Sequence, residues 1–464
     1  MNLTVLIPEL GLFLGGIAVF LLSLTKTRTL ALSTGILWLI TASLFGISPA
    51  ELFGKNYAWD GLSQYFSILI LAATFFATLL GYLHPGPGRI SYPKFVLLLF
   101  SLASVLIFLA GSQNLLYFLI LGSIAQFMFY LLLREFDSQQ AWHYLILDLV
   151  SSLVFLSGVG LLYAVSGALN LIDLKTNLVI DFFRFGLPGK ILPVSLILIT
   201  VALVYKLGSF PFYFWLGKFP KHQNLLPYSL FSLLIRLGFL AFAIRFWLRG
   251  VLIYGEDWQF ILFIGGIGSI LWGSLGLISW PQKNRSWLYL DLVQVGFLIC
   301  AISAPTLTSL SSGLFFLWSY FFSFWGLIFV FALFNKQSFD FVSLFSQIKS
   351  SKVALISSIL FICSIVGLPF TAGFWGKYSL ICGLFKEKMW GLAGAGLVSV
   401  PLLLFYFVVN LRKGLALKSA DLPNRAPLVL RIGLLLCAAA ILSVGFFPEI
   451  ILQLVLEAAA SIPF

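Results

Sequence analysis

Hydrophobic residues occur along this chain in long runs that are separated by short polar segments. One membrane-spanning helix needs about 20 apolar residues, and fourteen of these runs are close to that length or longer. They lie near residues 3–24, 29–48, 61–83, 94–111, 114–133, 142–166, 190–209, 225–247, 259–280, 286–304, 313–334, 353–385, 390–411 and 428–453. No soluble domain fits between the runs, and the first is too long for a cleaved signal peptide. We therefore predict an all-α membrane protein with about 14 transmembrane helices.

Composition and charge agree with this pattern. The chain is 61% hydrophobic and 9% charged, and its mean hydropathy is +1.06, which excludes an ordinary soluble domain. The net charge of +12 does not indicate nucleic-acid binding, because Lys and Arg gather in alternate loops. If both termini lie on the outer side of the membrane, the loops on the inner side hold more than twice as many basic residues as the loops on the outer side. We expect a multi-pass protein of the cell inner (plasma) membrane with both termini on the periplasmic side.

The run at 353–385 is too long for one straight span, and it contains the segment GLPFTAGFWGKYSL between Gly367 and Leu380. Pro369 removes a backbone donor there, and Lys377 is the only charge within residues 354–385. Placing a lysine in the centre of a membrane-spanning helix raises the free energy of insertion by about 2.5–3.5 kcal/mol, so such a lysine rarely occurs without a function. A broken helix with a buried lysine indicates an ion or proton path. The alternative is a lysine near a helix end whose ammonium reaches the interface.

A second lysine–proline pair stands in the segment ALVYKLGSFPFYFWLGKFP. Here Lys206 precedes Pro211, whereas Lys377 follows Pro369, so the two elements run in opposite directions across the predicted membrane. Broken helices at matching positions of inverted repeats are typical of transport sites. We predict two inverted five-helix repeats, helices 4–8 and 9–13, with helices 7 and 12 broken at these prolines. The corresponding segments are 1–92 (three N-terminal helices), 93–250 (first repeat), 251–415 (second repeat) and 416–464 (helix 14).

Three further charges fall inside apolar runs. Asp148 has apolar neighbours on both sides, so its carboxylate should pair, bind a cation or be protonated. Arg236 is effectively always protonated and can supply a fixed positive charge. Asp291 is the second candidate carboxylate, although it could also be an interfacial acid near Arg285.

The sequence carries little sign of redox or metal chemistry. The four cysteines are scattered in apolar runs and form no CxxC pair, and no Gly-rich nucleotide fingerprint is present. We therefore expect no cofactor, no metal and no redox centre on this chain.

Several segments resemble one known family. YKLGSFPFYFW, NRSWLYLDLVQVGF and GLPFTAGFWGKYSL are similar to three signature regions of the antiporter-like subunits of respiratory complex I. IPELGL, DGLSQYFS and SGALNL match the pattern of the N type, which is the mitochondrial chain 2 counterpart. The resemblance covers nearly the whole chain and implies fourteen helices in two inverted repeats, with a row of buried charges as the proton path.

The resemblance also assigns residues. Lys206 and Lys377 take the places of the family's lysines in helices seven and twelve, and Arg236 falls where helix eight usually has a lysine. Two positions depart from the pattern, because the helix-five glutamate falls on Ser123 and the helix-ten histidine on Gln294.

A charged Lys206 needs a counter-charge, and Ser123 cannot supply it. We therefore predict that Asp148 lies within direct or one-water reach of Lys206, with Asp291 as a further candidate partner.

By this resemblance we expect a proton-translocating subunit that couples NADH:quinone electron transfer in partner subunits to proton pumping. Moving the carboxylate away from Lys206 would push its proton toward Arg236 or the central axis, and Lys377 would exchange a proton with the outside. The partners would be other membrane-arm subunits and the lipid bilayer, with no nucleic acid. NAD, FMN, iron–sulfur clusters and quinone would be bound by partner subunits.

Two alternatives remain. The chain could belong to an Mrp-type cation/proton antiporter or a membrane-bound hydrogenase, or it could be a structural subunit that has lost translocation.

Overall fold

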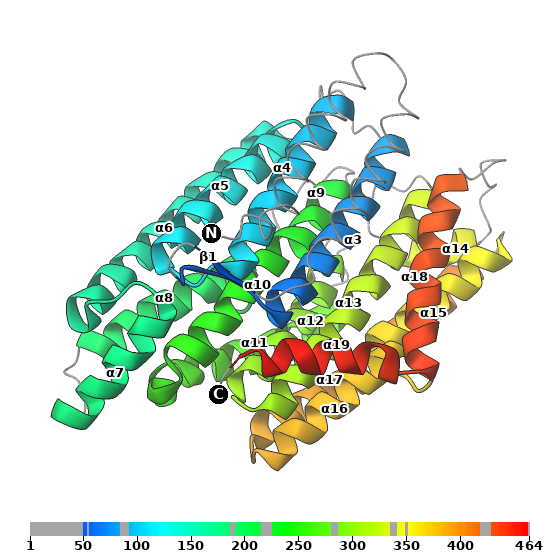
Figure 1. Cartoon of the computed structure of the whole chain (residues 1–464). Helices are drawn as coiled ribbons and strands as arrows, with labels where there is room; N and C mark the ends of the chain where they lie inside the picture. Colours follow the sequence, from blue (N-terminus) through cyan, green and yellow to red (C-terminus); the bar gives the residue numbers. More distant parts are fainter. Residues whose placement is uncertain are drawn as a thin grey trace. The chain divides into compact units, whose positions relative to one another are not determined.

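The computed structural model describes residues 50–52, 55–83, 92–185, 191–214, 225–279, 286–334, 341–348, 351–417 and 428–462 (Figure 1). The predicted runs at 3–24 and 29–48 lie outside these residues. In the first part of the chain the elements are β1 (Ala50–Leu52), β2 (Tyr57–Trp59), α3 (Gly61–Leu83), α4 (Tyr92–Gly111), α5 (Leu115–Arg134), α6 (Ser138–Ser166), α7 (Leu171–Phe185), α8 (Ile191–Leu207) and α9 (Leu225–Leu230). Next come the π-helical η3 (Phe231–Ile235), α10 (Arg236–Arg245), the π-helical η4 (Phe246–Gly250) and the 3₁₀ turn η5 (Leu252–Tyr254).

The remaining elements are all α-helices: α11 (Gly255–Ser279), α12 (Ser286–Ser303), α13 (Leu307–Leu333), α14 (Phe341–Ile348), α15 (Lys352–Val366), α16 (Ala372–Lys386), α17 (Trp390–Ala416), α18 (Leu428–Phe446) and α19 (Glu449–Ala460). Within the described residues, eleven helical segments are long and apolar enough to cross a membrane. Each coincides with one of the predicted runs, so the chain is a multi-pass membrane protein. The total of about 14 spans stays a prediction.

The chain divides into two compact units. Unit 1 comprises residues 1–207, 230–261 and 457–464, and unit 2 comprises residues 208–229 and 262–456. The domain boundaries predicted from the sequence stay predictions.

Unit 1 is built around α10. This helix packs against α3, α4 and α8 (Figure 1). Every residue from Phe231 to Gly250 is largely withdrawn from solvent. The antiparallel hairpin of β1 and β2, with Ala50 opposite Trp59, lies before α3 and is the only sheet in the described part of the chain.

Unit 2 is built around α13. This helix is almost entirely buried and packs against α12, α15, α16 and α18. Helices α17 and α18 of the same unit keep a large apolar surface exposed, as expected where helices face lipid.

The predicted break in helix twelve is clear in unit 2. The run at 353–385 forms α15 and α16, which are separated by residues 367–371. Gly367 adopts the left-handed conformation that ends α15, with φ of 91°, and Pro369 lies within the break. Helix seven behaves similarly, because α8 ends at Leu207 and is followed by Gly208 with φ of 70° and by a cis bond between Phe210 and Pro211.

Two helices differ from the sequence prediction. The run at 428–453 does not form one span, because α18 ends at Phe446 and Pro448 starts a separate helix, α19. Helix α7 was not predicted, since Asp173 and Lys175 make it too polar for a span. Its first turn is capped by Asn170, whose Oδ1 accepts a hydrogen bond from the backbone N–H of Ile172 at 2.9 Å.

Candidate functional site

Asp148 and Lys206 form a buried ion pair in unit 1. Lys206 Nζ lies 2.8 Å from Asp148 Oδ1, and the two side chains are 2% and 4% exposed, respectively. The same ammonium donates to Ser152 Oγ at 3.1 Å. The prediction that Asp148 lies within direct reach of Lys206 is confirmed, whereas a role in proton transfer stays a proposal.

The pair is placed by the polar stripe of α6. Tyr144, Asp148, Ser151 and Ser152 recur at helical spacing and are all buried against unit 1. The opposite face is apolar and exposed; it includes Ile146, Leu149, Val150 and Leu153. This pattern is the reverse of a soluble amphipathic helix and directs the carboxylate toward α8. Sequence reasoning missed Ser152, although its position four residues after Asp148 on one helix is a usable signal.

Lys206 lies in the last turn of α8. The last carbonyl groups of a helix carry partial negative charge, which favours a cation at this end. The ammonium also lies 5.2 Å from the centre of the Phe239 ring on α10. Lys206 thus contacts the same helix that carries Arg236.

Arg236 is buried at the start of α10, directly after the π-helical segment η3. Its guanidinium lies 5.6 Å from the Phe231 ring centre, and Nη1 donates to the carbonyl oxygen of Ser232 at 3.4 Å. π-helical turns inside α-helices occur frequently at functional sites. The structure therefore places Arg236 in the core of unit 1, close to the helix face that receives Lys206.

Ser123 lies on the exposed face of α5, where its hydroxyl donates to the carbonyl oxygen of Leu119 at 2.7 Å. The position that carries a glutamate in the resembling family therefore points away from the core of unit 1. The counter-charge for Lys206 comes from α6 instead of α5.

Lys377 is buried beside the helix break of unit 2 and is 2% exposed. Its Nζ donates to the carbonyl oxygens of Ile365 at 2.6 Å and Val366 at 3.3 Å, which are the last residues of α15. The ammonium also lies 4.7 Å and 6.0 Å from the ring centres of Phe297 and Phe316. Among the described residues it contacts no carboxylate, so carbonyl dipoles and ring faces hold the ammonium.

Two glycines of the GLPFTAGFWGKYSL segment make this geometry attainable. A Cβ atom at Gly373 would lie 1.8 Å from the carbonyl oxygen of Ser364, so only glycine lets α16 approach α15 this closely. A Cβ at Gly367 would lie 2.9 Å from Cδ of Lys377, and this residue also has a positive φ. The close packing of α15 and α16 at the break, and with it the position of Lys377, therefore depends on these two glycines.

Asp291 is buried on α12 in unit 2, with 1% exposure. Its Oδ1 accepts a hydrogen bond from the hydroxyl of Tyr320 on α13 at 2.5 Å. Gln294 is buried one turn further along α12. The structure does not bring Asp291 into contact with Lys377, whose ammonium contacts Phe297 two turns along the same helix.

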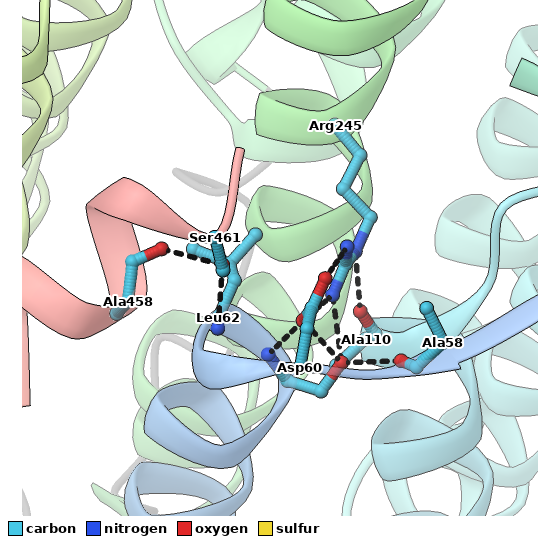
Figure 2. A network of polar contacts seen from close by, with 8 residues as sticks. Ala58, Asp60, Leu62, Ala110, Arg245, Ala458 and Ser461 are labelled. Atoms are coloured by element: carbon cyan, nitrogen blue, oxygen red, sulfur yellow. Dashed lines mark hydrogen bonds and ion pairs between the residues drawn. The ribbon is translucent and has the colours of Figure 1, made fainter. Parts of the chain in front are cut away.

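A second ion pair in unit 1, between the buried Arg245 and the partly exposed Asp60, was missed by sequence reasoning. Arg245, at the end of α10, donates to Asp60 at 2.6 Å and 2.5 Å through its two terminal nitrogens (Figure 2). It also donates to Ser63 Oγ at 2.7 Å and, through Nε, to the carbonyl oxygen of Ala110 at 3.0 Å. The pair thus joins the start of α3 and the ends of α4 and α10.

Besides pairing with Arg245, Asp60 caps the N-terminus of α3. Its Oδ1 accepts a hydrogen bond from the backbone N–H of Ser63 at 3.0 Å. Burial alone would raise the pKa of the Asp60 carboxyl, but the charge and hydrogen bonds of Arg245 and the bonds from Ser63 hold that pKa below its ordinary value. Asp60 therefore stays ionised as a structural partner of Arg245.

Comparison with known proteins places this architecture in one family. The family model described as NADH:quinone oxidoreductase/Mrp antiporter, TM, matches residues 96–402. NADH-quinone oxidoreductase subunit N 1 of Aquifex aeolicus is 25% identical over 99% of this chain and 100% of its own length. F(420)H(2) dehydrogenase subunit N of Methanosarcina mazei is 24% identical over 92% of this chain and 90% of its own length.

Solved structures share the fold. A chain of respiratory complex I from Thermus thermophilus with bound Aureothin has a TM-score of 0.79 and 20% identity over 97% of this chain and all of its own. A chain of the Mrp complex from Dietzia sp. DQ12-45-1b has a TM-score of 0.81 and 15% identity over 100% of this chain and 98% of its own. These matches confirm the predicted resemblance to antiporter-like subunits of the N type. The chain belongs to the family of membrane subunits that NADH:quinone oxidoreductases and Mrp antiporters share.

Proposed function

We propose that this chain is the N-type, proton-translocating subunit in the membrane arm of a complex of the respiratory complex I type. The observation that carries the proposal is the buried ion pair between Asp148 and Lys206. Removing two charges from water is costly, and an apolar pair of similar size would be at least as stable. A pair of titratable groups at this depth of a membrane protein is therefore best explained by ion transfer.

The pair can act as a switch for one proton. With the carboxylate at 2.8 Å, the ammonium of Lys206 is stabilised. If a movement of α6 or α8 separates the two groups, burial favours the neutral amine, and the proton leaves Lys206 Nζ. The permanent positive charge of Arg236 on α10 repels that proton and limits where it can rest.

Lys377 supplies a second step in unit 2. Its acceptors are neutral carbonyl groups and aromatic faces, so it can exchange a proton without a carboxylate that must move. The ends of broken helices are where membrane transporters bind ions. We infer that Lys377 exchanges its proton with the outside.

The decisive experiment compares Asp148→Asn and Lys206→Ala with Asp173→Asn, which changes an exposed carboxylate on α7. Proton uptake is followed with a pH-sensitive dye in inside-out vesicles while NADH is oxidised by the assembled complex. We expect both core variants to lose most proton uptake and the control to keep it. Normal uptake in Asp148→Asn would contradict the proposal.

The finer features belong to the same proposal. We infer fourteen spans in two inverted five-helix repeats, a plasma-membrane location with periplasmic termini, and partner subunits that hold NAD, FMN, iron–sulfur clusters and quinone. Among the described residues, no group of three His, Cys, Asp or Glu side chains could hold a metal ion.

One alternative also has support. The similarity to the Mrp complex structure extends over the whole chain, so a cation/proton antiporter assembly is the second candidate. Purification of the chain with its natural partners distinguishes the two, because only a complex I assembly contains iron–sulfur clusters. A structural subunit without translocation would be indicated if neither lysine affected proton uptake.

A further inference from the structure

A basic surface lies at the end of unit 2 where α15 and α18 begin. The two segments at this end, residues 335–353 and 410–433, contain eight basic and two acidic residues. Lys352, in the first turn of α15, and Arg431, near the start of α18, are both exposed. Among the described residues neither side chain forms an ion pair. Both cations can therefore bind a negative group from outside the chain.

Helices α15 and α18 lie side by side in unit 2 (Figure 1). Both also pack against α13, so their exposed faces point away from that helix and belong to one outer surface. These faces are apolar; they include Val353, Ile356 and Ile359 on α15 and Ile432, Leu435, Leu436 and Leu442 on α18. Helices that pack together have axes about 8–10 Å apart. Long Lys and Arg side chains on two such neighbours can reach the same small group.

The two cations lie at nearly the same height along these helices. The end of α18 contacts the helix break that follows α15, because a Cβ atom at Gly445 would lie 2.6 Å from the carbonyl oxygen of Phe370. Lys352 and Val366 are the two ends of α15, and Arg431 precedes Gly445 on α18 by the same number of residues. At a rise of 1.5 Å per residue, both cations are about 21 Å from the level of the break.

This height corresponds to the lipid headgroups. The break separates α15 and α16, which have 15 residues each, so it lies near the middle of the membrane. Half of the hydrocarbon layer is about 15 Å thick, whereas the cations are about 21 Å from the break. They are therefore level with the phosphate groups of the lipids. The exposed apolar faces of α15 and α18 lie between the cations and the midplane, beside the acyl chains.

We propose that the surface formed by α15 and α18 binds one anionic phospholipid, whose phosphate contacts Lys352 and Arg431 and whose acyl chains lie on the apolar faces below them. Charge complementarity identifies this occupant. A zwitterionic lipid carries a cation of its own, which two basic side chains repel. An apolar transmembrane helix of another subunit would cover the faces but would offer the two cations no negative group.

The two side chains complement each other as phosphate ligands. The guanidinium of Arg431 can bind two phosphate oxygens at once, whereas the ammonium of Lys352 acts as a point charge. The first backbone N–H groups of α15 carry partial positive charge and add to the attraction. Basic side chains at this depth attract anionic lipids by electrostatics, so both the affinity and its dependence on the headgroup should follow the two charges.

The test uses the assembled complex in phosphatidylcholine vesicles that contain a minor share of a photoactivatable lipid. One probe has a phosphatidylglycerol headgroup and the other a phosphatidylcholine headgroup, with the reactive group in the same acyl chain. After illumination, the labelled peptides are identified by mass spectrometry. We expect the phosphatidylglycerol probe to label α15 and α18, near Ile356 and Leu435, far more strongly than the phosphatidylcholine probe. Equal labelling of these helices by both probes would overturn the proposal.

Variants of the exposed cations test the assignment of the residues. Lys352→Gln combined with Arg431→Gln should lower labelling by the phosphatidylglycerol probe about 25-fold, since each basic residue near the surface contributes about fivefold. Lys352→Arg combined with Arg431→Lys keeps both charges and should keep most of the labelling. The matched control is Lys386→Gln with Lys388→Gln, which removes two exposed charges at the far end of α16. Unchanged labelling in the first variant, or an equal loss in the control, would refute the proposal.

Two further outcomes distinguish a lipid from other occupants. Inorganic phosphate added to the wild-type vesicles should not reduce labelling, and a reduction to the level of the Lys352→Gln and Arg431→Gln variant would show a site for soluble phosphate instead. If a helix of a neighbouring subunit covers this surface, the phosphatidylglycerol probe will label that helix and neither α15 nor α18, which would also overturn the proposal. None of these measurements depends on proton uptake, so the lipid site and the proposed function can fail separately.

Discussion

A double-mutant cycle at Asp148 and Lys206 would separate the effect of this ion pair on stability from its effect on proton transfer. At 2.8 Å and an effective dielectric constant of about 20, the attraction between the two charges is about 6 kcal/mol. The desolvation of the two ions, several kcal/mol for each, offsets most of it. The net contribution of the pair to stability is therefore small, although neither charge is tolerated alone.

Each single variant should consequently be less stable than the double variant. Asp148→Asn or Lys206→Met leaves one buried charge without its partner, and this change costs about 3–5 kcal/mol. The combined variant removes both charges and should recover most of the stability. Proton uptake should be lost in all three. The assay is the temperature at which half of the detergent-solubilised complex dissociates on a native gel, measured together with uptake in vesicles.

The reasoning is refuted if the double variant is less stable than both single variants, because the pair would then stabilise the fold outright. It is equally refuted if the double variant pumps protons. Ser152, which also accepts a hydrogen bond from Lys206, provides the control. Ser152→Ala should lower stability by about 1 kcal/mol and leave most proton uptake intact.

Two predictions concern the helix break of unit 2. Lys377→Met should abolish proton uptake while the complex still assembles. Among the described residues the ammonium of Lys377 contacts only carbonyl groups and rings, so its removal leaves no opposite charge unpaired there. Normal uptake would show that this lysine is dispensable. Gly373→Ala should prevent stable assembly, because its Cβ would lie 1.8 Å from the carbonyl oxygen of Ser364. Recovery of the complex on a native gel equal to that of the wild type would contradict the close approach of α16 to α15.

The sequence was most informative where a charge lies inside an apolar run. Asp148 and Lys206 stand alone in such runs of the same half of the chain, and the cost of burying either without a partner is large enough to predict the contact. The eleven spans of the described residues were predictable from hydropathy, because a long apolar run identifies a helix that enters a membrane.

Other features carry no comparable signal. The partner of Asp60 lies 185 residues away at the end of α10, and a carboxylate at a helix start also fits an interfacial position. The acceptors of Lys377 are backbone carbonyls, which every residue possesses, so no residue type could reveal them. Helix α19 was not predicted as a separate element because its apolar residues continue the run of α18 across Pro448.

The different acceptors of the two lysines give the two units different sensitivities to mutation. The counter-charge of Lys206 is encoded by a single codon, so one nucleotide change at Asp148 can remove it. Lys377 depends on main-chain oxygens of Ile365 and Val366, which remain when the side chains of these residues are exchanged. Across many generations, α15 can therefore change its side chains while it keeps its cation site, provided that the glycines of the break persist. In unit 1, by contrast, a lost carboxylate must be replaced by another acidic side chain that reaches Lys206.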